Sequence, residues 1–180
     1  TPSGVPYDDL RPEQIVEMAF DGRVIDAGTP SSEWRFHRDI LAARQDVDVV
    51  LHAHPTHATA LACLHRDIPA FHYMVAVAGG ESIRCAPYAT FGSQELSARA
   101  IDALMGRKAC LLANHGMLVA DNDLAAALNL AIEVETLAAQ YLKTLQVGEP
   151  VLLGPEEMAE VLERFKSYGV RGAPRPRRLG

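Results

Sequence analysis

Two short apolar runs that each end near a histidine constrain the fold of this 180-residue chain more than any other feature. The first run, residues 48–53 (DVVLHA), is followed closely by Pro55. The second run, residues 109–113 (ACLLA), is followed by the turn sequence Asn114-His115-Gly116. Runs of this length between turn signals are typical of buried strands. Residues 117–120 then predict the strand that returns after the turn.

Helical patterns separate these strands in an irregular order. They cover residues 34–44, 57–64, 92–105, 123–145 and 155–167. A further strand is predicted at 70–77, and Asp21-Gly22 predicts a hairpin between residues 15 and 26. The regular strand–helix–strand order of a doubly wound sheet is missing. We therefore expect an α/β domain of three layers (αβα) with a central mixed, mostly antiparallel sheet.

Composition excludes several classes of protein. Apolar residues make up 48% and charged residues 22%, which is the balance of an ordinary soluble core rather than a disordered chain. A net charge of −6 argues against nucleic-acid binding. No apolar run reaches the roughly 20 residues of a membrane-spanning helix, and no signal peptide is visible. Cys63, Cys85 and Cys110 form no CxxC motif and are predicted to be small buried residues. We expect a cytoplasmic protein.

The chain opens with Thr1-Pro2-Ser3-Gly4 and has no initial methionine. This segment has the pattern of a turn that already lies inside a fold. We therefore expect that residues of the natural polypeptide precede Thr1.

His52-Ala53-His54 is the sharpest local signal for chemistry. On a strand, residues two apart lie on one face at a spacing of roughly 6.6 Å. Two imidazoles in that arrangement can bind one metal ion, and zinc favours nitrogen ligands. Pro55 indicates that the pair lies at a sheet edge. Taken alone, the motif fits a pair of core or surface histidines better than it fits a metal site.

Two other positions strengthen the metal hypothesis. His115, in a turn after a strand, would complete the three-ligand set of a catalytic zinc site, although an ordinary turn histidine has the same pattern. Glu33 precedes a helix, where a carboxylate is favoured by the helix dipole or could bind metal and move protons. Ser31 and Ser32 offer backbone N–H groups that could hold an anion.

The remaining aromatic positions are less informative. Tyr73 has the pattern of a half-buried strand aromatic. His57, His65 and His72 are predicted to be structural or surface histidines, and His37 fits either interpretation.

Five blocks in order resemble the class II aldolase/adducin family. They are residues 30–37 (PSSEWRFH), 52–54 (HAH), 68–74 (IPAFHYM), 85–92 (CAPYATFG) and 114–116 (NHG). The resemblance extends from Thr1 to about residue 170. It implies a single domain over 1–170 with the fold of that family, followed by a flexible Pro/Arg-rich tail over 171–180.

The resemblance also implies roles for individual residues. His52, His54 and His115 match the zinc ligands, and Glu33 matches a carboxylate that covers the metal and exchanges protons. The positions that match the binding site of the substrate phosphate are Ser3, Gly4, Ser31 and Ser32. Tyr73 matches a proton donor, and Tyr168 matches a mobile tyrosine that closes over the site of a neighbouring subunit in a homotetramer.

The implied activity is reversible, zinc-dependent cleavage of L-fuculose 1-phosphate, or a related ketose 1-phosphate, to dihydroxyacetone phosphate and L-lactaldehyde. The alternatives are an aldolase for 5-deoxyribulose or methylthioribulose 1-phosphate, a ribulose-5-phosphate 4-epimerase, and an interaction module like the adducin head. The intact metal residues argue against the interaction module. One departure is clear: family members begin with a helix and a Gly-Asn-x-Ser segment of the phosphate pocket, which this chain lacks.

Overall fold

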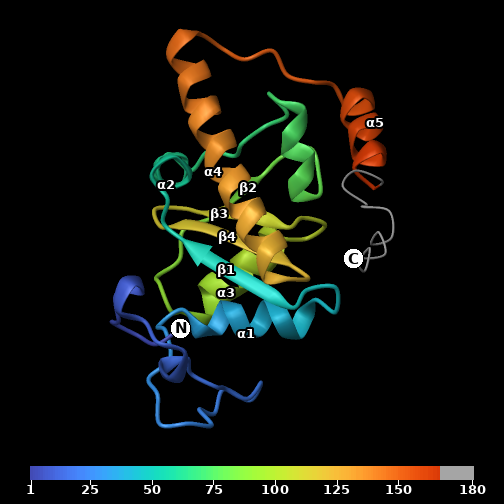
Figure 1. The fold of residues 1–180 in the computed structure, drawn as a ribbon. Helices are drawn as coiled ribbons and strands as arrows, with labels where there is room; N and C mark the ends of the chain where they lie inside the picture. The colour runs from blue at the N-terminus through green and yellow to red at the C-terminus, as the bar shows by residue number, and fades with distance from the viewer. Residues whose placement is uncertain (167–180) are drawn as a thin grey trace, which may run out of the picture.

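A four-stranded sheet forms the centre of the computed structural model, which describes residues 1–166 (Figure 1). Its strands are β1 (Val49–Ala53), β2 (Arg84–Ala86), β3 (Ala109–Leu112) and β4 (Gly116–Asp121), in the spatial order β1-β4-β3-β2. β4 pairs antiparallel with β1 and β3, whereas β2 pairs parallel with β3. The sheet is mixed and mostly antiparallel, which confirms the predicted fold class.

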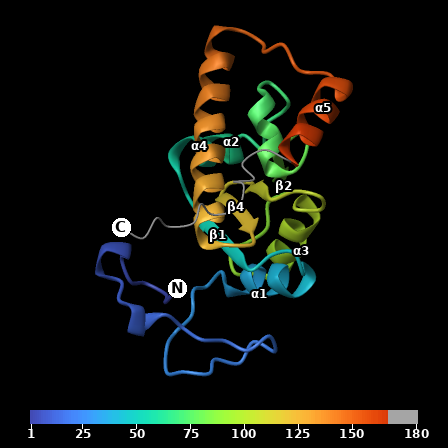
Figure 2. The ribbon, with the colours of Figure 1, turned by 45° about the vertical axis from the view of Figure 1, so that its right-hand side comes forward.

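Helices cover both faces of the sheet (Figures 1 and 2). On one face lie α1 (Trp34–Ala43) and α3 (Gln94–Ala103), and on the other lie α2 (Thr56–Cys63) and the long α4 (Leu124–Val147). The last helix, α5 (Pro155–Phe165), packs on the short helix η3 (Tyr73–Ala78). The result is the expected three-layer arrangement.

Alternating side chains of the central strands build a separate core on each face. On β3, Leu111 packs with α2 and α4, whereas Leu112 packs with α1 and α3. On β4, Val119 packs in the core with α2 and α4, whereas Leu118 packs in the core with α1 and α3. Successive strand residues point to opposite faces, so a strand between two helical layers must be apolar throughout. This explains why these strands are visible in the sequence as uninterrupted apolar runs.

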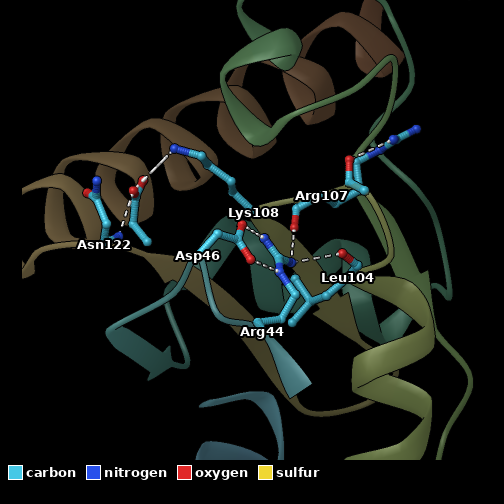
Figure 3. A network of polar contacts seen from close by, with 8 residues as sticks. Arg44, Asp46, Leu104, Arg107, Lys108 and Asn122 are labelled. Carbon is cyan, nitrogen blue, oxygen red and sulfur yellow. Dashed lines mark hydrogen bonds and ion pairs between the residues drawn. The ribbon is translucent and has the colours of Figure 1, made fainter. Parts of the chain in front are cut away.

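Arg44 joins the end of α1 to the turn between α3 and β3 (Figure 3). Its guanidinium donates to the carbonyl of Leu104 at 3.2 Å and to that of Arg107 at 2.9 Å. The carboxylate of Asp46 accepts from Arg44 Nε at 2.8 Å and from Nη2 at 2.6 Å, and this contact lowers the pKa of Asp46 to about 2. The Leu104 carbonyl also accepts from the N–H of Arg107 at 2.9 Å, so the guanidinium adds a second hydrogen bond there and ties the end of α1 to this turn.

One predicted strand is wrong. Residues 70–77 do not form a strand, because residues Tyr73–Ala78 form the 3-10 helix η3. The ring of His72 accepts a hydrogen bond from the N–H of Met74 at 3.2 Å, which begins the helix, and Gly79 ends it with φ +90°. The apolar run is buried against α4 and α5 rather than in the sheet.

Two other elements differ from the sequence prediction. Strand β2 was not predicted, since it has only three residues and pairs with β3 alone among the described strands. The predicted hairpin is present as a turn, in which the N–H of Ala19 donates to the carbonyl of Arg23 at 2.9 Å. It carries a single bridge, between Met18 and Val24, rather than two strands.

The first 32 residues lie outside the layered core, and none of them is buried (Figures 1 and 2). They contain two single-turn helices, η1 (Tyr7–Asp9) and η2 (Pro12–Gln14). The opening turn returns against the segment before α1, where the Ser3 N–H donates to the carbonyl of Thr29 at 2.9 Å. The predicted tail over 171–180 lies outside the described residues.

Two sequence expectations concern general properties of the chain. No helix among residues 1–166 has the length and apolar character needed to cross a membrane. Cys63, Cys85 and Cys110 are free thiols, but only Cys110 is buried, and Cys63 is exposed. The prediction that all three are buried is therefore wrong.

Candidate metal centre

The strand order brings His52, His54 and His115 together. β1 is antiparallel to β4, so the end of β1 lies beside the start of β4, with Ala53 opposite Met117. The turn that carries His115 comes directly before β4. The ligand atoms of the three imidazoles all lie within 4.8 Å of one another. His52 Nε2 and His54 Nε2 are 2.8 Å apart.

Hydrogen bonding and burial prepare His52 to act as a ligand. Its Nδ1 contacts the carbonyl of Met117 at 2.9 Å, so the N–H lies at Nδ1 and the lone pair of Nε2 faces the other rings. Burial lowers the pKa of His52 to about 3, and burial also lowers the pKa of His115. Both rings are therefore neutral near pH 7, which is the form that binds metal.

The donor set fits a divalent metal ion. Zinc bonds imidazole nitrogen at about 2.0–2.1 Å, which in tetrahedral geometry places two ligand nitrogens roughly 3.3 Å apart. The 2.8 Å between the Nε2 atoms of His52 and His54, and the 4.8 Å limit on all ligand-atom separations in the cluster, lie on either side of that spacing. No fourth His, Cys or carboxylate belongs to the cluster within residues 1–166. Three protein ligands leave a position open for substrate, as in catalytic zinc sites.

The turn before β4 needs a glycine as well as a histidine. A Cβ atom at Gly116 would lie 2.6 Å from the carbonyl oxygen of Ala53 and 2.6 Å from Cδ2 of His54. Asn114 has φ +53°, and its side chain accepts from Nε2 of His65 at 2.5 Å. The sequence signals a turn here, but only the folded chain shows that Gly116 makes room for the ring of His54.

Glu33 lies at the start of α1 as a buried carboxyl group, 7% exposed. Burial raises its pKa, an effect that the N–H of Gly92 partly offsets. Its Oε2 has no hydrogen-bond partner among the described residues. Glu33 is not part of the histidine cluster, but Phe36, one turn later, contacts the ring of His52 with centroids 5.2 Å apart. The structure therefore holds a buried acid with one unpaired oxygen, one helical turn before a residue that contacts the histidine cluster.

The four predicted phosphate positions come from two neighbouring segments. The two segments run antiparallel: the Ser31 N–H donates to the carbonyl of Thr1 at 3.0 Å, and the Ser3 N–H donates to the carbonyl of Thr29 at 2.9 Å. This register places Thr1 opposite Ser31, and Ser3 opposite Thr29. The Ser31 hydroxyl accepts from the N–H of Glu33 at 3.2 Å. Within the described hydrogen bonds, the N–H groups of Gly4 and Ser32 are unpaired. Exposed N–H groups before a helix are suited to binding an anion.

Of the two predicted tyrosines, Tyr73 is not brought to the cluster in the described part of the chain. Tyr73 is the first residue of η3, is half exposed, and contacts the ring of His72 with centroids 4.8 Å apart. No contact within residues 1–166 joins it to the three imidazoles. Tyr168 lies outside the described residues.

A large apolar cleft adjoins the cluster along β1, with a volume of about 920 Å³. Trp34, Leu128 and Ile132 are among the apolar residues that line it, and His52 also lines it. His54 and His115 are not among its described lining residues. Sequence reasoning missed this cleft because its walls come from the N-terminal segment, α1 and α4, which are distant along the chain.

Comparisons with known proteins indicate the family of this chain. The family model of the class II aldolase and adducin N-terminal domain matches residues 1–142. A Rhodospirillum rubrum 5-methylthioribulose-1-phosphate/5-deoxyribulose-1-phosphate aldolase is 57% identical over 169 residues, which cover 94% of this chain and 76% of the relative. The L-fuculose phosphate aldolase of Escherichia coli K12 is 51% identical over 172 residues, with 95% and 80% covered.

A solved structure shows the same fold. An L-fuculose 1-phosphate aldolase superposes with a TM-score of 0.89 at 46% identity, over 92% of this chain and 78% of that one. The family model covers well over half of the chain, and the relatives align over nearly all of it. The chain belongs to the class II aldolase and adducin family.

Proposed function

We propose that this class II aldolase uses Zn²⁺ to cleave a ketose 1-phosphate reversibly to dihydroxyacetone phosphate and a short aldehyde. The observation that carries the proposal is the meeting of three imidazoles with ligand atoms within 4.8 Å, in a chain that also holds the buried carboxyl group of Glu33, whose Oε2 lacks a partner among the described residues. When bound, the metal would polarise the substrate carbonyl and stabilise the negative charge left after carbon–carbon cleavage. His52, His54 and His115 would hold it.

The residues of the chain supply the remaining chemistry. The N–H groups of Gly4 and Ser32, with the hydroxyls of Ser3 and Ser31, would bind the phosphate and fix the substrate. Glu33 would deliver a proton to substrate C3 after cleavage and remove it in the reverse direction. A carboxyl group whose pKa is raised by burial exchanges protons more readily near neutral pH.

Tyr73 is the proposed partner of the C4 hydroxyl group, whose proton must leave during cleavage. It is half exposed and makes no contact with the three clustered histidines of its own chain in the described region. We therefore propose that it reaches the site of another copy in a homotetramer, with Tyr168 closing over that site.

The substrate specificity of the enzyme depends on which aldehyde forms the second half of the ketose 1-phosphate. The relatives from Rhodospirillum rubrum and Escherichia coli are named for different ketose 1-phosphates, at 57% and 51% identity. These sugars share the dihydroxyacetone phosphate half and differ beyond C4. The higher identity favours 5-deoxyribulose or 5-methylthioribulose 1-phosphate over L-fuculose 1-phosphate.

The test is release of dihydroxyacetone phosphate by zinc-loaded protein, followed with a coupled reductase. We expect release from both 5-deoxyribulose and L-fuculose 1-phosphate, with kcat/KM values that differ by about 10-fold or more in favour of the former, because small differences in an apolar pocket discriminate on that scale. Release from neither sugar by protein that binds zinc would contradict the proposal. Conversion of ribulose 5-phosphate at C4 without aldehyde release would instead identify an epimerase.

A further inference from the structure

Helix α2 begins directly after the histidine pair and lacks a capping side chain of its own. Its first residue is Thr56, and the preceding Pro55 has no side-chain acceptor for the free N–H groups of the first turn. Such groups are normally satisfied by a Ser, Thr, Asp or Asn at the cap position. The sequence at this point therefore leaves the start of α2 dependent on another part of the chain.

Glu135 of α4 supplies the missing acceptor. One carboxylate oxygen accepts from the N–H of His57 at 2.9 Å, and the other accepts from the N–H of Ala58 at 2.8 Å. The ring Nδ1 of His57 also contacts Glu135, at 2.7 Å. The side chain of Glu135 is 26% exposed, so these contacts are partly shielded from water. A negative charge at a helix N-terminus adds a favourable dipole interaction.

The contacts of Glu135 with the N–H groups of His57 and Ala58, called the clamp below, begin only three residues beyond His54. Pro55 restricts the connection, and its carbonyl accepts the first helical hydrogen bond, from the N–H of Thr59 at 2.9 Å. The Glu135 carboxylate therefore fixes the direction in which the chain leaves β1, and with it the backbone of His54.

The ring of His54 depends on that backbone more than the ring of His52 does. His52 is oriented by the carbonyl of Met117. For His54, the only hydrogen-bond contact of the ring within residues 1–166 is with Nε2 of His52, on the metal-binding side. A metal-binding histidine is usually held through its other nitrogen by a carboxylate or carbonyl. His54 lacks that support in the described part of the chain, so its placement relies on the backbone on either side of it.

We propose that Glu135 is a positioning residue of the metal centre: by clamping the start of α2 it holds His54 in place for the metal. The inference rests on the proposed metal-dependent function. It assigns no direct contact between Glu135 and the metal or the substrate. A cap with a purely structural role would affect the free energy of unfolding but not the affinity of the folded protein for zinc.

The experiment compares Glu135→Gln with Glu133→Gln in the full chain. In the first variant the new amide side chain has nearly the size of the native carboxylate but turns an N–H₂ group toward the backbone donors. Glu133, on the same helix, takes no part in the clamp, so its variant controls for the loss of one charge. The zinc Kd is measured by competition with a chromophoric chelator, in buffer where each variant is folded by circular dichroism.

We expect the zinc Kd of Glu135→Gln to rise about 10- to 100-fold, the usual effect of removing a group that supports a ligand. The Kd of Glu133→Gln should stay within about 2-fold of the wild type, well below the effect of losing such a group. The visible spectrum of bound Co²⁺ should change only in Glu135→Gln. Glu135→Asp, which keeps the charge, should recover part of the affinity. It also serves as the test variant if Glu135→Gln does not fold.

Each result has a definite meaning. Equal zinc Kd values and equal Co²⁺ spectra for Glu135→Gln and the wild type would overturn the positioning role and leave the proposed function intact. If Glu135→Asp is the variant used, a zinc Kd and a Co²⁺ spectrum equal to those of the wild type would likewise overturn the positioning role. Failure of the wild type itself to bind zinc would overturn both.

Discussion

His115→Ala is expected to lower the rate of aldol cleavage by on the order of 10³-fold or more, because loss of metal-based charge stabilisation is worth several kcal/mol. The imidazoles of His52, on β1, and of His54, directly after it, would remain, but two ligands are fewer than the three of a catalytic zinc site. His115 comes from the turn before β4, and it is the only candidate ligand of the described cluster that does not come from β1 or the residue after it. The measurement is dihydroxyacetone phosphate release at saturating zinc.

The free energy of unfolding of the metal-free protein separates this effect from damage to the fold. His115 is partly exposed in a turn, so His115→Ala should change that free energy by less than about 1 kcal/mol. A variant that unfolds normally and retains more than a tenth of the wild-type rate would show that His115 does not hold a catalytic metal.

Glu33→Gln is expected to keep zinc and to lose activity by about 10²- to 10⁴-fold, the usual contribution of a proton-transferring side chain. Glu33 is not in the histidine cluster, so metal content should not depend on its charge. The specific measurement is exchange of the C3 proton of dihydroxyacetone phosphate with deuterated solvent, followed by NMR. Exchange at the wild-type rate in the zinc-loaded variant would exclude Glu33 as the proton carrier.

The same variant should be more stable than the wild type when both are metal-free. Burial raises the pKa of Glu33, so above the pKa of the unfolded state the ionised carboxylate destabilises the fold. Near pH 7, Glu33→Gln should raise the free energy of unfolding by ~1 kcal/mol, the scale of one unsatisfied buried group. The gain should disappear as the pH falls below about 4, where the carboxyl group is protonated in both states. A gain that persists at low pH would contradict this explanation.

The parts of the fold that could be predicted from the sequence depend on local pattern. β1, β3 and β4 are apolar runs between turns, because each is covered on both faces by helices. Helix α3 was predicted from the segment that includes Ser93, whose hydroxyl accepts from the N–H of Leu96 at 3.1 Å. The segment 70–77 has the same apolar character, and nothing local shows that it packs between helices as η3 instead of joining the sheet.

In the candidate site, too, local sequence patterns predict some features, whereas contacts between distant residues could not be predicted. The three histidines were predicted because two of them lie two apart on one strand and the third follows a strand. The contacts that prepare them come from distant residues: the carbonyl of Met117 on His52, and the absent side chain of Gly116 beside His54. A backbone carbonyl has no sequence signature, and the separation of 78 positions between His57 and Glu135 conceals their contact.

Removal and return of the metal tests the central claim most directly. The protein is stripped with a chelator, dialysed, and titrated with Zn²⁺ while dihydroxyacetone phosphate release from the better ketose 1-phosphate is followed. The account predicts that the stripped protein is inactive and that activity rises in proportion to added zinc until one ion per chain is bound. Cleavage by the metal-free protein at the zinc-loaded rate would contradict it.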